Sequence, residues 1–207
     1  DLEAIVQGLN LDKVKLIGHS FGGLLCLKYA LKFPNIVDKI VLVNSAPVDH
    51  KGFLKYLAKS LEFSDKYGGE LSEIENSPEF KAQEASALNR YMNIAKKNLF
   101  YDKDAEYEIE IPATYETLRS FKAIWEIMIA EGLKIRSKQV IDPSPITQST
   151  LIMHGVEDTV PIDSMKEMEG IMNNAHLIPF ENTGHSVLIE KNKESISLIN
   201  EFFNNNF

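Results

Sequence analysis

The sequence predicts an α/β fold with a mostly parallel sheet, helices on both faces and an inserted helical segment. At both ends of the chain, short apolar strand segments alternate with helical segments, which is the pattern of a parallel α/β sheet. The strand segments are apolar on both faces, as expected for strands that are covered on two sides. The middle of the chain has helical periodicity and almost no strand signal, so we do not expect it to join the sheet.

We expect four strands, at residues 14–17, 40–43, 150–153 and 175–179. The pattern of apolar residues predicts a first helix over residues 1–10 and a second over 21–33, which Pro34 closes. Towards the end of the chain, it predicts helices over 162–172 and 187–203. The core of the protein is therefore expected to consist of residues 1–47 and 146–207.

Residues 48–145 are interpreted as a helical cap. Helices are predicted over 51–66, from Pro78 to about Leu99, and over 115–131, with a polar loop over 101–112. Ser77 is a good N-cap because Pro follows it at the first helical position. We expect this cap to lie over the carboxyl ends of the strands, where open α/β sheets bind ligands.

Composition excludes some classes of partner. The net charge is −8, and acidic and basic residues are interspersed, so nucleic acid is not an expected partner. The longest apolar runs are too short to cross a bilayer, so no membrane partner is expected either. The single cysteine, Cys26, rules out an intrachain disulfide and fits a reducing compartment, which makes a cytoplasmic location the expectation.

The strongest motif is Gly18-His19-Ser20-Phe21-Gly22, which matches G-x-S-x-G. It lies between a predicted strand and a predicted helix, the context in which a nucleophilic serine occupies a sharp, strained turn. Gly18 and Gly22 leave room for the turn, and Gly23 allows the helix to pack closely. We therefore predict that Ser20 is a nucleophile at the positive end of a helix dipole.

A nucleophilic serine needs a histidine base, and in this arrangement the chain order is serine, acid, histidine. His185 fits that order, because it lies in the loop between the last strand and the last helix. Of the other histidines, His19 is expected to pack and His50 to be solvated. His154 precedes the likely acid, which is the wrong chain order for a base, and His176 opens a strand.

The predicted acid is Asp158, in the turn that follows the third strand at Gly155-Val156-Glu157-Asp158. A carboxylate at the carboxyl end of this strand can orient the imidazole of His185. The local alternatives are Glu157 and Asp163, and Asp49 is a more distant one. An ordinary turn or helix-capping aspartate is the competing interpretation of Asp158.

Together these residues resemble the α/β-hydrolase family with a helical cap. The resemblance rests on Gly18 to Gly23, on His154-Gly155-x-x-Asp158-x-x-Pro161 and on Gly184-His185-Ser186. It implies Ser20 as nucleophile, Asp158 as acid and His185 as base, with the backbone N–H of Phe21 as one oxyanion-hole donor. The serine argues against the haloalkane dehalogenases of this family, which use an aspartate. No metal ion or other cofactor is implied.

Within the family, the sequence around the motif is most similar to that of proline iminopeptidases, at Leu11-Asp12-Lys13-Val14 and at residues 30–34. In that group, glutamates of the cap hold the free amino group of the substrate. Trp125 and Glu126 are the candidates for substrate binding, and Glu116 and Glu131 are alternatives for the carboxylate. A tryptophan in the cap core beside a solvated glutamate is the competing interpretation.

The expected reaction is hydrolysis of an ester or amide through an acyl-enzyme. The first substrate class is a short peptide with an N-terminal residue such as proline, and the alternative is a small acyl ester cleaved by a carboxylesterase or lipase-like enzyme. A ligand-binding protein that keeps the fold without catalysis is the alternative outside enzymes.

The family resemblance also implies strands before the serine motif, whereas here the motif begins at Gly18 after a single helix. We therefore expect that the N-terminal strands of the fold are absent from this chain. An N-terminal segment of the same protein would pair with the strand at 14–17 and supply the second oxyanion donor.

Overall fold

The computed structural model describes residues 1–105, 113–134 and 141–204. Its sheet contains β1 (Val14–His19), β2 (Val37–Val43), β3 (Ser149–Gly155) and β4 (Ala175–Phe180), in that order and all parallel. All four predicted strands are confirmed, and each extends at least one residue beyond its predicted bounds. The α/β fold class with a parallel sheet is therefore confirmed.

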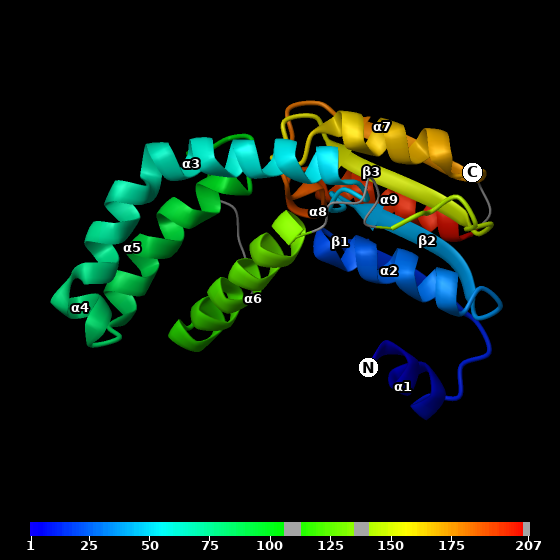
Figure 1. Ribbon diagram of the computed structural model, residues 1–207, viewed down its shortest axis with the longest axis horizontal. Helices are drawn as coiled ribbons and strands as arrows, with labels where there is room; N and C mark the ends of the chain where they lie inside the picture. Colours follow the sequence, from blue (N-terminus) through cyan, green and yellow to red (C-terminus); the bar gives the residue numbers. More distant parts are fainter. Residues whose placement is uncertain (106–112, 135–140, 205–207) are drawn as a thin grey trace.

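Helices cover both faces of this sheet because the apolar side chains of the strands alternate between two cores (Figure 1). Ile40 and Leu42 of β2 pack with α2 (Phe21–Lys32) and α7 (Ile162–Ile171). Val41 and Val43 pack in the other core, with α8 (Val187–Glu190) and α9 (Asn192–Phe203). These four β2 side chains are fully buried, as expected for a central parallel strand.

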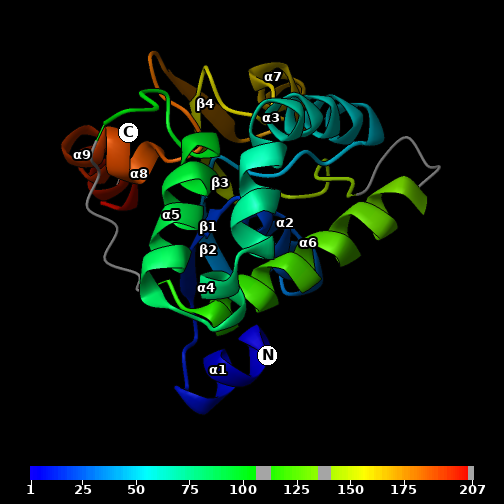
Figure 2. The same cartoon turned by 90° about the vertical axis from the view of Figure 1, so that its left-hand side faces the viewer.

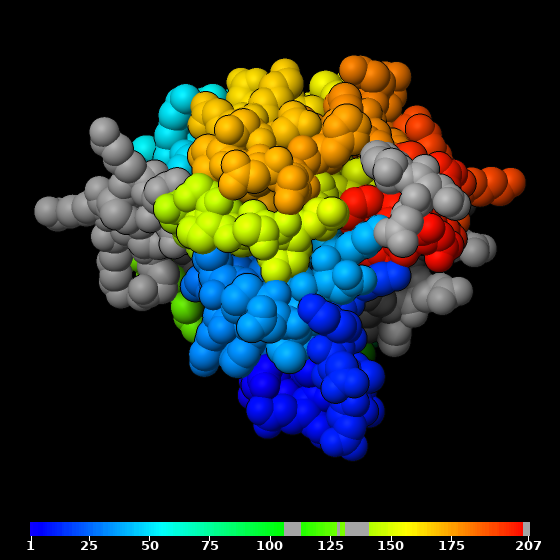
Figure 3. Space-filling model, turned by 90° about the vertical axis from the view of Figure 1, so that its right-hand side faces the viewer, coloured from blue at the N-terminus to red at the C-terminus, as the bar shows by residue number. Residues whose placement is uncertain are grey.

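Helix α1 (Leu2–Gly8) projects from the sheet layers, as Figures 1 and 3 show. Its one buried side chain, Val6, joins the core beneath α2. The phenol of Tyr29 on α2 donates a hydrogen bond of 2.6 Å to Glu3 Oε2. These two contacts fix α1 to the start of the sheet.

Between β2 and β3 the described residues form helices and no strand. We call α3 (His50–Asn76), α4 (Pro78–Lys81), α5 (Ala85–Ala95), the 3₁₀ turn Lys96–Asn98 and α6 (Tyr115–Lys134) the middle helices. They have a separate apolar cluster, formed by Ile74, Leu88, Tyr91, Ile94 and Leu118. Figure 2 shows α3, α5 and α6 in front of the sheet when the molecule is viewed from their side.

The two ends of this helical segment lie side by side. The backbone N–H of Ile141 donates to the carbonyl of Val48 over 3.1 Å, which brings the two ends of the segment together. Two close attachment points are what an insertion between neighbouring strands requires. The middle helices can therefore be inserted without changing the pairing of β2 with β3.

Three predicted helices differ from the observed ones. The first middle helix continues to Asn76 instead of ending near residue 66. The helix predicted from Pro78 to Leu99 is interrupted after Lys81, because Gln83 has a left-handed φ of 60° that no α-helix accommodates. The helix predicted over 187–203 is divided at Lys191, whereas the Ser77 N-cap is confirmed by a 3.2 Å bond from the N–H of Phe80. Of the predicted loop over 101–112, residues 106–112 lie outside the described part of the chain.

Within the described residues, β1 and β4 are the edges of the sheet. Ile17 in the middle of β1 is 50% exposed although it is flanked by buried Leu16 and Gly18. The expected additional strand beside β1 stays a prediction. None of the described helices combines the length and the hydropathy that crossing a bilayer needs.

Candidate active site

Ser20 occupies a sharp turn between β1 and α2. Its backbone has φ 55° and ψ −123°, a left-handed φ that costs energy for a residue with a side chain. Two backbone bonds hold this geometry, from the N–H of Ser20 to the carbonyl of Val43 and from the N–H of Ala46 to the carbonyl of Ser20, both 3.0 Å long. The turn leaves the Ser20 side chain half-exposed at the N-terminus of α2.

Two of the three glycines around the serine are needed for close packing. A Cβ on Gly18 would lie 2.5 Å from the backbone oxygen of Gly22, and one on Gly23 would lie 2.1 Å from Ser45 Oγ. A Cβ on Gly22, by contrast, would have no described atom within 4 Å. The prediction that Gly22 leaves room for the turn is therefore not supported by its surroundings, because the side chain would point into open space.

His185 connects the serine to the acid. Its Nε2 lies 3.0 Å from Ser20 Oγ, and its Nδ1 lies 2.8 Å and 3.0 Å from the two carboxylate oxygens of Asp158. A proton on Nδ1 donated to the carboxylate leaves the lone pair of Nε2 free to accept the serine proton. The backbone N–H of His185 donates to the carbonyl of Leu99, so the residue that follows the 3₁₀ turn of the middle helices also fixes this loop.

Asp158 is fully buried in the turn after β3. The N–H of Val160 and the hydroxyl of Thr159 donate to its Oδ1, over 3.0 Å and 3.2 Å. The amide of Asn44 donates to Oδ2 over 2.8 Å. A buried carboxylate with these donors can hold a negative charge next to an imidazole.

The charge state of Asp158 follows from these contacts. Burial alone would raise the pKa of its carboxyl group. The nearby charge and hydrogen bond of His185, together with His154 and the Asn44 amide, outweigh burial and lower the pKa to about 2. Asp158 is therefore ionised at neutral pH and can stabilise a protonated His185.

The other carboxylates that were considered as acids have different partners. Asp49 accepts the N–H of Gly52 over 2.8 Å as the N-cap of α3. Glu157 accepts the N–H of Thr183 over 2.9 Å and so supports the histidine loop. Asp163 lies in the first turn of α7, 3.8 Å from the amine of Lys55 on α3. Among the described carboxylates, only Asp158 is hydrogen-bonded to the His185 side chain.

The remaining histidines show one role that the sequence did not indicate. His19 was expected to pack, but its Nε2 donates to the backbone carbonyl of His185 over 2.8 Å, and the two rings lie 4.9 Å apart. His154 is fully buried and donates to the carbonyl of Val160 over 2.8 Å. His50 was expected to be solvated, but its Nδ1 is buried, with no hydrogen-bond partner in the described residues. His176 is exposed at the start of β4.

Two polar residues that support the site were missed from the sequence. Asn44 directly follows β2 and is fully buried. Glu190 on α8 accepts the backbone N–H groups of Gly184 and Tyr101, over 2.8 Å and 2.7 Å. An asparagine directly after the apolar run at residues 40–43 is a signal that could have identified Asn44, since buried polar residues need partners.

The predicted substrate-binding residues lie on α6. Trp125 is half-buried, with its ring against Tyr56 of α3 at 5.7 Å and Phe121 at 6.4 Å. Glu126 is exposed and forms no hydrogen bond with Ser20. Glu116 is exposed in the first turn of α6, and the side chain of Glu131 lies outside the described residues. The structure therefore brings Trp125, but not Glu126, into contact with a neighbouring helix.

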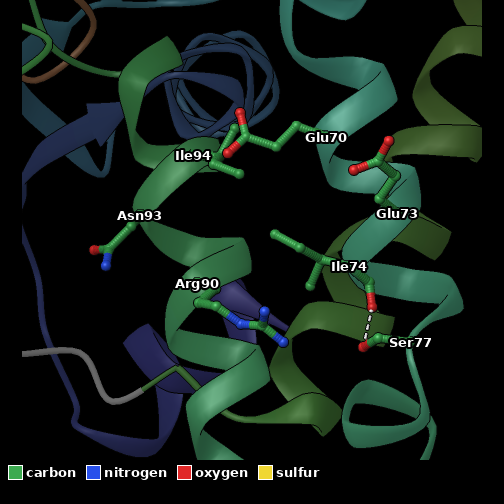
Figure 4. Close-up of a pocket in the computed structure, with 7 residues that line it drawn as sticks. All are labelled: Glu70, Glu73, Ile74, Ser77, Arg90, Asn93 and Ile94. Carbon is green, nitrogen blue, oxygen red and sulfur yellow. Dashed lines mark hydrogen bonds between the residues drawn. The ribbon is translucent and has the colours of Figure 1, made fainter.

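A cavity of about 420 Å³ lies between α3 and α5, away from the triad (Figure 4). Figure 4 shows charged side chains on both sides of it, and none of its lining residues belongs to the Ser20 site. It is lined by Glu70, Glu73, Ile74, Ser77, Arg90, Asn93 and Ile94. Within the residues that can be described, no group of three or more His, Cys, Asp or Glu side chains is arranged to hold a metal ion.

The chain is similar in sequence to several known hydrolases. The chain is 26% identical over 202 residues to a 2-hydroxy-6-oxo-2,4-heptadienoate hydrolase of Pseudomonas putida, which covers 97% of this chain and 67% of that protein. It is 27% identical over 205 residues to a proline iminopeptidase of Saccharolobus solfataricus, covering 92% of the chain and 62% of the relative. Proline iminopeptidase is thus one hydrolase name among several.

A solved structure shows the same fold. An alpha/beta hydrolase enzyme from a Medee basin deep-sea metagenome library superposes with a TM-score of 0.62 at 18% identity, over 98% of this chain and 69% of that one. The profile of the alpha/beta hydrolase fold family matches residues 1–192. The chain therefore belongs to the alpha/beta hydrolase fold family, to which its parallel sheet and its serine turn had pointed.

Proposed function

We propose that the protein is a serine hydrolase that cleaves an ester or amide bond through an acyl-enzyme. The observation that carries the proposal is the continuous path from Ser20 Oγ through both ring nitrogens of His185 to the carboxylate of Asp158. A ligand-binding protein would have no need of all three groups at these distances. The strained backbone at Ser20 also supports a functional role, since such strain collects at active sites.

In the proposed mechanism, His185 Nε2 takes the proton of Ser20 as Oγ attacks the substrate carbonyl. Asp158 stabilises the imidazolium, which then protonates the leaving alcohol or amine as the acyl-enzyme forms. Water attacks the acyl group in the second half of the cycle, with His185 again acting first as base and then as acid. The products are the carboxylic acid and free Ser20.

The N–H of Phe21 is the proposed first oxyanion donor, because it follows Ser20 at the first position of α2. The first N–H groups of a helix have no partner within the helix, and the helix dipole favours negative charge there. We further propose that a segment from outside residues 1–207 pairs with the edge of β1 and supplies a second donor. The exposed edge of β1 supports this proposal, as unpaired strand edges accept added strands.

We propose that residues 48–145 act as a cap that selects the substrate. Three large apolar side chains of α6 are exposed, namely Phe121, Ile124 and Ile127, at 63%, 55% and 63%. Together with half-buried Trp125 they form an apolar face that suits the acyl group of an ester. An aminopeptidase acting on N-terminal proline is the second candidate, supported by Glu126 beside Trp125 on the same helix.

The two substrate classes can be separated by profiling the complete protein against short-chain nitrophenyl esters and aminoacyl-naphthylamides. Ser20→Ala provides the background rate for both. Turnover of esters that rises with acyl length and falls in Trp125→Ala would support the ester. Turnover of prolyl-naphthylamide that falls in Glu126→Gln but not in Glu116→Gln would support the aminopeptidase. Activity that Ser20→Ala retains would contradict the serine mechanism.

A further inference from the structure

Asn44 lies at the junction of three segments that build the triad. It follows β2 with a left-handed φ of 45°, a conformation that asparagine adopts more readily than most residues. Its backbone N–H donates to the carbonyl of Met153 over 2.8 Å, which holds it against β3. The backbone geometry thus fixes the direction of the Asn44 side chain.

The Asn44 amide is used by three partners. Its Nδ2 donates to Asp158 Oδ2 over 2.8 Å and to the backbone carbonyl of Gly184 over 3.0 Å. Its Oδ1 accepts the N–H of Val187 over 3.2 Å. The acid turn, the residue before His185 and the first residue of α8 are therefore joined by one fully buried side chain.

We infer that Asn44 is a positioning residue that sets Asp158 and His185 against each other for proton transfer from Ser20. The inference rests on the proposed serine mechanism. Val160 and Thr159 donate only to Oδ1 of Asp158, so the hydrogen bonds to Oδ2 come from Asn44 and His185, and His154 Nε2 lies 3.5 Å away. Without the amide, the carboxylate can rotate about the Oδ1 bonds and the histidine loop loses its link to the acid turn.

The requirement for an amide is specific. Leucine would leave the Val187 N–H, the Gly184 carbonyl and one carboxylate oxygen of Asp158 without the partner they have now, and unsatisfied buried groups are costly. Aspartate has almost the same shape but places a second carboxylate against Asp158, and the repulsion between two ionised carboxylates raises the pKa of one of them. Asparagine is the residue of this shape that donates two bonds and accepts one without adding charge.

The test uses the second-order rate constant for labelling of the protein by a fluorophosphonate, which reports activation of Ser20 without a known substrate. We expect Asn44→Ala to reduce this constant about 10- to 100-fold at every pH, the effect of losing one or two bonds to a charged group. Asn174→Asp is the matched control: its amide donates to the carbonyl of Thr147 on the exposed surface, and we expect normal labelling.

Asn44→Asp adds a pH signature. The charged or titratable groups around Asp158 are His185, His154, His19 at the end of β1, and Lys59 and Tyr56 of α3. At acidic pH the new carboxyl group is protonated and can donate to Asp158 as the amide does. We therefore expect the labelling deficit relative to the wild type to shrink as pH falls, whereas the deficit of Asn44→Ala stays constant. A merely structural role would produce no such difference.

The outcomes separate the two proposals. A wild-type protein that is not labelled, or one that Ser20→Ala leaves labelled, contradicts the serine mechanism. A labelled wild type with Asn44→Ala and Asn44→Asp both labelled at the wild-type rate contradicts the role of Asn44. Circular dichroism establishes that each variant is folded, and unfolding of both Asn44 variants at all pH values would assign Asn44 a structural role and overturn the inference.

Discussion

His185 Nε2 lies 3.0 Å from Ser20 Oγ although 165 positions separate the two residues in the chain. The contact forms because Ser20 follows β1 and His185 follows β4, and the carboxyl ends of parallel strands meet at one edge of the sheet. The strands β2 and β3 between them contribute Asn44 and the Asp158 turn. Each of the four strands is thus followed by one polar residue of the site, at the same edge of the sheet.

Replacement of Ser20, the proposed nucleophile, should remove activity without unfolding the protein. We expect Ser20→Ala to abolish labelling by a fluorophosphonate and to reduce turnover to background, because no other hydroxyl is hydrogen-bonded to His185 Nε2 among the described residues. Labelling followed by mass spectrometry checks this. Ser195→Ala is the control, since Ser195 is a buried serine that lies in α9. Persistent label on Ser20→Ala would contradict the assignment.

The lowered pKa of Asp158 makes stability depend on pH. Its pKa of about 2 in the folded state lies below the value of about 3.9 for an unfolded chain. The folded state therefore gains stability that is fully present above about pH 4 and is lost as pH falls through 2. The difference corresponds to about 2 kcal/mol in the free energy of unfolding.

This pH dependence is measured as the difference between the wild type and Asp158→Asn in urea unfolding from pH 6 to pH 2. Other carboxylates contribute equally to both proteins and cancel in the difference. We expect the wild type to lose more stability than the variant over this range. Parallel curves for the two proteins would show that the buried contacts of Asp158 do not lower the pKa of its carboxyl group.

Gly18 should not tolerate a side chain. A methyl group there would lie 2.5 Å from the oxygen of Gly22 and 2.7 Å from Cys26 Sγ, so β1 and α2 would have to separate. We expect Gly18→Ala to lower the free energy of unfolding by about 1 to 3 kcal/mol and to reduce activity. Gly68→Ala in α3 is the control, because its Cβ meets nothing described and should stabilise the helix by about 0.5 to 1 kcal/mol. Equal effects of the two changes in thermal unfolding would refute the packing argument.

Lysines at every fourth position of α3 contact α7 and the turn that contains Asp158. Lys51 pairs with Glu167 of α7 over 2.9 Å, and Lys59 donates to the backbone carbonyl of Asp158 over 2.8 Å. We expect Lys59→Met to destabilise the protein by about 1 to 2 kcal/mol and to lower activity, because a charged donor to the acid turn is lost.

Lys51→Met is the matched control on the same face of α3. Both members of its ion pair are exposed, at 66% and 46%, and exposed pairs contribute little. Thermal unfolding and ester turnover of the two variants give the comparison. A loss of activity in Lys51→Met as large as that in Lys59→Met would mean that the contact with the acid turn has no particular role.

Much of this site could be predicted from local sequence. The glycine-flanked Ser20, the acid after the third strand and the histidine after the fourth follow from strand endings and chain order, and the geometry joins them as expected. Helix boundaries were less predictable. The left-handed Gln83 and the division at Lys191 have no strong local signal, because neither a proline nor a glycine marks them.

The sequence by itself determined the parallel α/β arrangement and the choice of Ser20, Asp158 and His185 as candidates. Both depend on short-range patterns of apolar, glycine and polar residues. Only the tertiary structure decided which groups hold them: Asn44 on Asp158, His19 on the carbonyl of His185, and Glu190 on the N–H of Gly184. The contacts of Asn44 and His19 join residues 114 and 166 positions apart in the chain, over only 2.8 Å each. Their formation therefore depends on strand register and loop path, which no local pattern encodes.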